Sequence, residues 1–200
     1  MSTVVTAEIR AESPPAGVMA IGKMGIWWFL ASEIMVFGGL IGSYVLYRLA
    51  SAGAWSEMAH HVSTGIGATN TLVLLTSSLT MVLAHAAIED EKRGRATLYL
   101  GLTVLGGLLF LGFKAIEYTT EISNGFTPLA GTFWSFYFTM TGLHGLHVLA
   151  GIIWIFALFL MAARGTLWPH TQQRVEYAGL YWHFVDIVWI FLFPLLYLSY

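Results

Sequence analysis

Six ionisable side chains fall inside long apolar stretches of this sequence, and their types set the chemistry that it could perform. They are Glu33, His85, His144, His147, His183 and Asp186. A charged group is costly in hydrocarbon, so such residues typically serve proton transfer, ligand binding or polar contacts between helices. The sequence contains no cysteine, so a thiolate site is excluded and any metal would need histidine or carboxylate ligands.

Glu33 carries the single carboxyl group of an apolar segment that is rich in aromatic residues. Within this segment it follows Trp27, Trp28 and Phe29. Two interpretations remain open at this point. The carboxyl group either exchanges protons or contacts lipid, or it is a neutral acid hydrogen-bonded inside the bundle.

His144 and His147 are three residues apart and therefore share one face of a helix. Together with His183 or His85 on other segments, they could hold a haem between helices. Glycines beside both histidines favour another interpretation, because they let a neighbouring helix approach closely enough for the imidazoles to form hydrogen bonds. We therefore expect polar packing and no metal site.

His183 and Asp186 are also three residues apart and could bond to each other or to a shared partner. Such a pair can orient an imidazole for acid–base chemistry, but no Ser or Cys nucleophile with a basic partner lies nearby in the sequence. We therefore expect a structural pair. Glu117, with Lys114 one turn before it, is expected to form a local ion pair that anchors the outer end of its segment.

The elements that carry these residues are predicted to be transmembrane helices. The chain has 200 residues, of which 57% are apolar and 10% are charged, and a helix needs about 20 mostly apolar residues to cross a bilayer. Five stretches meet that need, at about residues 24–47, 66–88, 97–113, 132–163 and 177–200. The predicted fold is an all-α membrane bundle of five helices over residues 21–200, preceded by a mobile cytoplasmic tail at residues 1–20.

Charge distribution predicts the orientation of the chain. The amino-terminal tail and the second and fourth links hold most of the basic residues: Arg10, Lys23, Lys92, Arg93, Arg95, Arg164 and Arg174. The opposite side has only Arg48 and Lys114, so the amino end is predicted to be cytoplasmic. A net charge of −2 and the lack of a basic tract exclude nucleic acid as a partner.

Two further predictions concern how the helices pack. At about 1.5 Å of rise per residue, Glu33, His147, His183 and Asp186 lie at a similar depth, so they could form one polar layer. Small residues four apart, Gly38/Gly42 and Gly39/Ser43, predict a packing face on the first helix. We find no internal repeat, which disfavours an inverted-repeat transporter.

Several motifs together resemble a known family, subunit III of the haem–copper respiratory oxidases, typified by cytochrome c oxidase. In chain order they are Ser32-Glu33, Asn70-Thr71, Glu117-Tyr118, Gly125, Gly131-Thr132-Phe133, His144-Gly145-Leu146-His147 and the run from Tyr181 to Trp189. The resemblance covers almost the whole chain. Longer members of the family have seven helices, and this chain resembles the last five, a short form found in bacteria.

The resemblance implies a non-catalytic core subunit of a proton-pumping terminal oxidase in the bacterial inner membrane. Haem and copper would lie in partner subunits, with subunit I as the main contact and subunits II and IV as further partners. Glu33 matches the family's buried carboxyl group, which is linked to proton uptake, and Arg164 matches a basic residue that contacts a lipid phosphate. The alternatives are a quinol oxidase subunit III, an accessory of nitric oxide reductase, a stand-alone bis-histidine cytochrome and a proton transporter.

Overall fold

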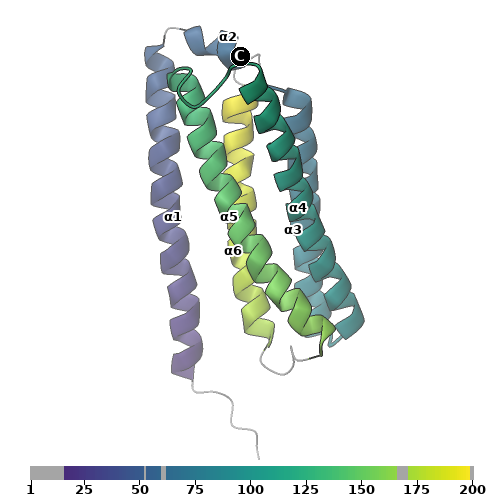
Figure 1. Cartoon of the computed structure of the whole chain (residues 1–200). Helices are drawn as coiled ribbons and strands as arrows, with labels where there is room; N and C mark the ends of the chain where they lie inside the picture. The colour runs from purple at the N-terminus through teal and green to yellow at the C-terminus, as the bar shows by residue number, and fades with distance from the viewer. Residues whose placement is uncertain (1–15, 52, 60–61, 166–170, 199–200) are drawn as a thin grey trace, which may run out of the picture.

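The structure is a computed structural model that describes residues 16–51, 53–59, 62–165 and 171–198 (Figure 1). Most of the predicted tail, residues 1–15, lies outside the described residues, and Ala16–Ala20 already belong to the first helix. The bounds of the helices are α1 Ala16–Ala50, α2 Ala54–Ala59, α3 Thr64–Glu89, α4 Arg93–Ser123, α5 Thr132–Ala163 and α6 Thr171–Tyr197.

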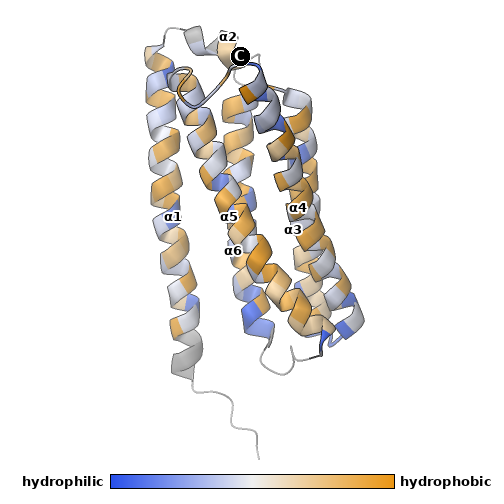
Figure 2. Cartoon of the chain, in the orientation of Figure 1, coloured by the Kyte–Doolittle hydropathy of each residue, from blue (hydrophilic) through white to orange (hydrophobic). Residues whose placement is uncertain are grey.

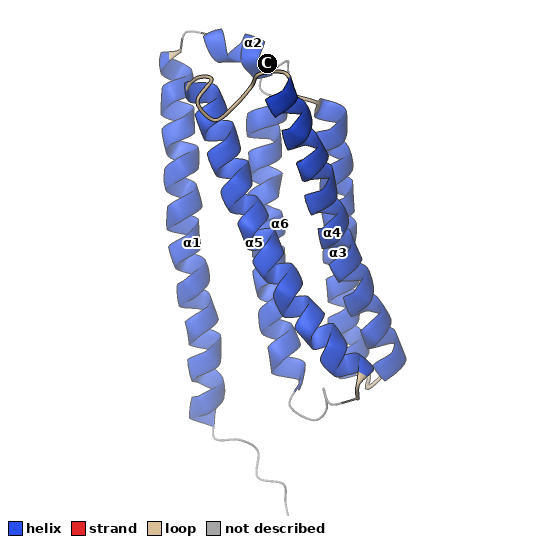
Figure 3. Cartoon of the chain, in the orientation of Figure 1, coloured by secondary structure: helices blue, strands red, loops and turns tan. Residues whose placement is uncertain are grey.

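All of the regular structure among the described residues is helical, as Figure 3 shows. Five of the helices are long and apolar enough to cross a membrane, and α2 is a single short turn-like helix between α1 and α3. The predicted all-α bundle with five membrane-spanning helices is therefore confirmed.

Local signals explain where several of these helices begin and end. The Ser63 side chain accepts a hydrogen bond from the Ile66 amide at 3.5 Å and caps the start of α3. At its other end, α5 reaches Arg164 and is followed by Gly165, which has a φ of +71°. Glycine adopts this left-handed conformation without steric cost, so it stops a helix in the usual way.

The long helices α3, α4, α5 and α6 pack against one another, and α1 lies alongside α5 and α6 (Figure 1). The helix with the largest buried share is α6. It places the fully buried rings of Trp182 and Trp189 in the core. Close approach to these rings needs small residues, since a Cβ added at Gly151 would lie 2.7 Å from Trp182.

Helix α1 contacts the bundle through one narrow stripe. Its buried side chains Leu30, Phe37 and Tyr44 recur every seven residues, a spacing that keeps one seam of a helix against its neighbours. The predicted glycine ladder of α1 is not part of this seam, because a Cβ added at Gly38, Gly39 or Gly42 would meet nothing within 4 Å. The prediction of a packing face at these glycines is therefore wrong for contacts within the chain.

Helix α4 is longer than the sequence indicated. It continues past Phe113 to Ser123. The sequence predicted Lys114 in a link and Glu117 at a helix end, but both residues lie inside α4 and are buried. The apolar run ends at Phe113, but the helix continues because these polar side chains find partners within the bundle.

Hydrophobic residues dominate the long helices, with hydrophilic residues at several helix ends and at a few positions part-way along them (Figure 2). The end at which α1, α4 and α6 begin carries Lys23, Lys92, Arg93, Arg95, Arg164 and Arg174. Arg48 lies at the opposite end, in the last turn of α1. Among the described residues, the basic side chains are therefore concentrated at one end of the bundle.

Candidate functional site

Glu33 on α1 and His147 on α5 form a direct polar contact. The Glu33 Oε2 atom lies 3.0 Å from the His147 Nε2 atom, and each side chain is 16% exposed. The pair joins the outlying helix α1 to the rest of the bundle. The expectation that an imidazole forms a hydrogen bond between helices is thus met at His147.

Both ring nitrogens of His147 have hydrogen-bond partners. The Nδ1 atom lies 2.8 Å from the Leu143 carbonyl oxygen, which can only accept a hydrogen bond. The Nε2 atom is therefore the ring nitrogen that faces the Glu33 carboxyl group.

Aromatic side chains surround the Glu33–His147 pair. The Phe37 ring packs edge-on against the imidazole with ring centroids 5.2 Å apart, and the Tyr181 hydroxyl donates to the His147 carbonyl oxygen at 3.0 Å. The Tyr181 ring also contacts Phe29 on α1. The pair therefore lies among aromatic side chains at the α1–α5 interface and stays partly exposed.

His183 and Asp186 do not bond to each other. The His183 Nδ1 atom lies 2.7 Å from the Ser78 hydroxyl group on α3. Ser78 also lies beside the Asp186 carboxyl group, although neither carboxyl oxygen has a hydrogen-bond partner and the residue is only 3% exposed. His183 therefore bonds to Ser78, a residue that the sequence did not single out.

The predicted polar layer therefore divides between two helix interfaces. Glu33 and His147 lie between α1 and α5, whereas His183 and Ser78 lie between α6 and α3. Within the described part of the chain, no hydrogen bond or ion pair connects these two pairs.

His144 is fully buried and lies between two rings. Its imidazole stacks on Trp189 at 5.1 Å and meets the edge of Phe110 at 5.5 Å. Neither ring nitrogen has a hydrogen-bond partner, so the expected hydrogen bond across helices is not formed at this residue. Among the residues that the structure describes, there is no group of three or more His, Cys, Asp or Glu that could hold a metal ion.

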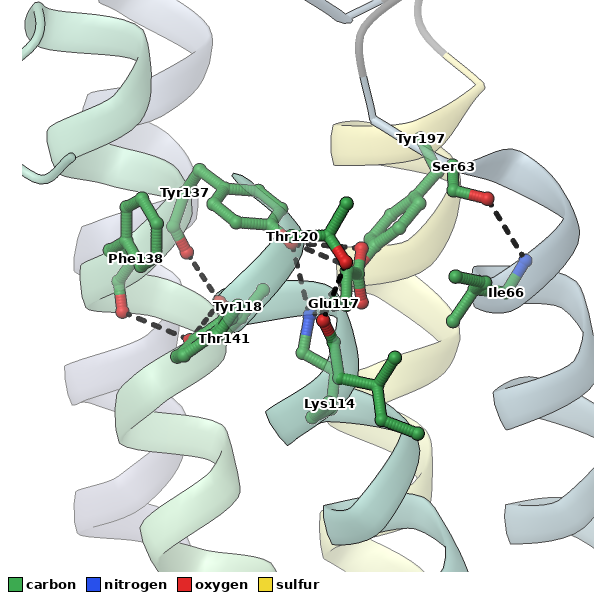
Figure 4. Close-up of polar contacts among 12 residues, drawn as sticks. Ser63, Ile66, Lys114, Glu117, Tyr118, Thr120, Tyr137, Phe138, Thr141 and Tyr197 are labelled. Atoms are coloured by element: carbon green, nitrogen blue, oxygen red, sulfur yellow. Dashed lines mark hydrogen bonds and ion pairs between the residues drawn. The ribbon is translucent and has the colours of Figure 1, made fainter. Parts of the chain in front are cut away.

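A buried polar network lies in the half of the bundle where α4 and α6 end and α5 begins (Figure 4). The Lys114 Nζ atom donates to Glu117 Oε2 at 2.9 Å and to the Tyr197 hydroxyl at 2.7 Å. The Tyr137 hydroxyl donates to Glu117 Oε1 at 2.8 Å. The predicted Lys114–Glu117 pair is therefore present, but as a buried connection among three helices and not as an anchor at the membrane surface.

Rings also enclose the Lys114 ammonium group. Its Nζ atom lies 5.0 Å from the ring centroids of Tyr118 and Tyr137 and 5.6 Å from that of Trp189. Aromatic faces attract a cation at such distances. The sequence showed the Lys114–Glu117 spacing, but Tyr137 and Tyr197, whose hydroxyl groups complete the network, are far away in the chain and gave no local signal.

Two of the residues considered from the sequence lie at the end of the bundle that carries most basic side chains. Arg164 follows α5 and is exposed. His85 lies in the last turns of α3 and is 3.8 Å from Glu89. Neither approaches the Glu33–His147 pair.

Comparison with known proteins gives the family. The family model described as cytochrome c oxidase subunit III matches residues 7–199. This chain belongs to the cytochrome c oxidase subunit III family. Within the family, cytochrome c oxidase subunit 3 of Bacillus subtilis (strain 168) is 37% identical over 201 residues, covering 96% of this chain and 94% of the relative.

Other relatives carry a different name. A probable quinol oxidase subunit 3 of Staphylococcus haemolyticus (strain JCSC1435) is 34% identical over 178 residues, covering 89% of each chain. One from Staphylococcus epidermidis (strain ATCC 12228 / FDA PCI 1200) is 31% identical over the same length. The resemblance to oxidase subunit III is therefore confirmed, and the chain is a multi-pass membrane protein of that family.

Proposed function

We propose that this chain works as a non-catalytic core subunit of a proton-pumping haem–copper oxidase that reduces oxygen to water. It packs on subunit I, with subunits II and IV as further partners, and the haem and copper lie in those partner subunits. The chain supports proton uptake and sustained turnover. Membership of the subunit III family supports this proposal, since the match covers residues 7–199.

The Glu33–His147 pair is the observation that connects this function to the structure. The two side chains are 3.0 Å apart and both are partly exposed. An imidazole and a carboxyl group in such contact can accept a proton and pass it on. We propose that the pair supports proton uptake by the oxidase or contacts lipid at this position.

We also propose an orientation and a membrane. The basic side chains Lys92, Arg93, Arg95 and Arg164 lie at one end of the bundle, and cytoplasmic segments carry the excess of such residues. That end faces the cytoplasm of a bacterium, and the carboxyl end of the chain lies in the periplasm. Exposed Arg164 is then placed to bind a lipid phosphate at the cytoplasmic surface.

Purification in mild detergent tests the proposed assembly. A tagged full chain, expressed in its own host, should co-purify with a large subunit that shows haem absorbance and consumes oxygen. A haem band that accompanies the chain alone and is lost on His144→Leu or His183→Leu substitution would instead identify a stand-alone cytochrome. Vesicles that contain only this chain should not conduct protons, whereas conduction would support a transporter.

A quinol donor is the second candidate, because relatives named quinol oxidase subunit 3 match 89% of the chain at 34% identity. The purified complex separates the two candidates directly. Oxygen consumption driven by reduced cytochrome c but not by quinol identifies a cytochrome c oxidase, and the reverse result identifies a quinol oxidase.

A further inference from the structure

A continuous groove follows the interface of α3 and α6 in the half of the bundle where α6 begins. Its inner part has a volume of about 320 Å³ and is lined by side chains that include Met81, Val82, Leu180 and His183. Its outer part has a volume of about 520 Å³ and is lined by polar residues that include Lys23, Gln172 and Gln173. Both parts include His85, Glu89 and Glu176, so the groove leads from the helix ends inward to His183.

Behind His183 lies a buried acid with no hydrogen-bond partner. His183 Nδ1 is 2.7 Å from the Ser78 hydroxyl, and Ser78 lies beside the Asp186 carboxyl group. Asp186 is 3% exposed, and neither of its oxygens has a hydrogen-bond partner. A buried polar group in this state is costly and calls for an explanation, such as a functional role.

We propose that Asp186 is a proton-binding site that exchanges its proton with the cytoplasmic side through Ser78, His183 and the α3–α6 groove. The proposal rests on the proposed function for the direction that the groove faces, and it deepens that function by naming a second proton-binding group besides the Glu33–His147 pair.

The relay moves one proton from the groove to Asp186 in three coupled transfers. A hydronium ion in the groove gives a proton to Nε2 of neutral His183 and becomes water, and the proton on Nδ1 passes to the Ser78 oxygen. The Ser78 hydroxyl at the same time gives its own proton to the Asp186 carboxylate. The products are a neutral Asp186 acid and a neutral His183 that carries its proton on Nε2, and Ser78 is unchanged. A hydroxyl group can do this because it both donates and accepts hydrogen bonds.

Charged groups from several helices face the groove. At its mouth, Lys23 of α1 pairs with Glu176 of α6 at 3.0 Å, and His85 pairs with Glu89 on α3 at 3.8 Å. Three ionisable groups inside the other packed helices have contacts elsewhere. Lys114 pairs with Glu117 on α4, and on α5 His144 stacks on Trp189 and His147 contacts Glu33. The titratable groups that line the route are therefore those of the groove itself.

Infrared spectroscopy of the full chain in phospholipid vesicles tests the proposal. The chain has only two aspartates, Asp90 and Asp186, and Asp90 has a 59% exposed side chain. Labelling with ¹³C-aspartate therefore assigns a buried carboxylic-acid band to Asp186 without any mutation. Asp186→Asn should remove this band, and transfer into D₂O should shift it as the proton exchanges.

A neighbouring pair of serines provides the matched control. Ser78→Ala should slow deuterium exchange of the Asp186 band on the order of 100-fold, the lower end of the effect of a positioned proton-transfer group. Ser77→Ala, which removes the hydroxyl that accepts from Trp182 Nε1 at 3.2 Å, should leave the exchange rate unchanged. His183→Phe should slow exchange as Ser78→Ala does.

Three results would overturn the proposal. One is the absence of an Asp186 acid band at every pH at which the chain stays folded. Another is equal exchange in the Ser78→Ala and Ser77→Ala variants. The third is exchange in the unmodified chain that is already as slow as in Ser78→Ala, as expected if a lipid acyl chain fills the groove. All are read from the chain in vesicles, so they are distinct from a failure of the chain to co-purify with haem-containing subunits.

Discussion

Removing one partner of the Lys114–Glu117 pair is expected to destabilise the bundle strongly. The two side chains are 7% and 1% exposed. Glu117→Leu deletes the carboxylate that accepts from Lys114 at 2.9 Å and from Tyr137 at 2.8 Å. Two hydrogen bonds to a charged group contribute about 1.5–3 kcal/mol each, which agrees with the cost of about 3–5 kcal/mol for breaking a buried ion pair. Lys114→Met should have a cost of similar size.

The double variant Lys114→Met/Glu117→Leu separates the pair from general packing damage. A buried ion pair replaced as a whole by apolar residues is often close to neutral, so the double variant should be more stable than either single variant. The free energy of unfolding can be measured by SDS titration in mixed micelles, with tryptophan fluorescence as the signal.

The exposed pair of Lys92 and Asp90 provides the control. Its side chains are 51% and 59% exposed, so solvent screens the pair and Lys92→Met should cost much less stability than either buried variant. The reasoning is refuted if the Lys114 and Glu117 variants lose no more stability than this control. It is also refuted if the costs of the two single variants simply add in the double variant.

Three further predictions concern other sites. Replacement of Glu33 by Gln should leave assembly and initial oxygen consumption largely intact, and loss of the whole complex from the membrane would show that the carboxyl group is structural. Gly151→Val should destabilise the chain by about 1–3 kcal/mol through overpacking, because the added Cβ would lie 2.7 Å from the Trp182 ring. Gly39→Val should not, because a Cβ there meets nothing within 4 Å. Thermal unfolding in detergent compares the two variants. Hydrogen bonding to Lys92 lowers the pKa of Asp90, so the small stabilisation by this pair should be present at neutral pH and be lost as the pH falls through that lowered pKa. The Asp90→Asn variant should lack this step in a titration of stability against pH.

The sequence predicted the helices well, because membrane-spanning segments follow from length and hydropathy alone. The prediction failed at the carboxyl-terminal end of α4, where the apolar run stops at Phe113 but the helix continues to Ser123. Hydropathy treats Lys114 and Glu117 as the start of a loop. The structure buries them because Tyr137 and Tyr197 complete their hydrogen bonds, and such distant partners leave no local pattern in the chain.

The site residues show the same limit. The presence of Glu33, His147, His183 and Asp186 inside apolar segments was evident, and so was their similar depth. Which of them meet depends on how the helices are rotated about their axes. Spacing along one helix therefore suggested a His183–Asp186 pair, whereas the structure joins His183 to Ser78 on another helix.

This chain has two kinds of buried polar group, those whose atoms all form hydrogen bonds and those whose atoms do not. The Lys114–Glu117 network is buried and joined to two tyrosine hydroxyls, so it needs no further ligand and connects three helices. Asp186 is equally buried but lacks a partner, and it lies beside a serine–histidine contact that ends in a groove. The Asp186 carboxyl group lies beside the Ser78 hydroxyl, but neither of its oxygens has a well-formed hydrogen bond, so its burial is not explained by a satisfied polar network. Exchange of a proton with the groove supplies that explanation, and it requires Asp186 to remain accessible to protons while it is closed to bulk water.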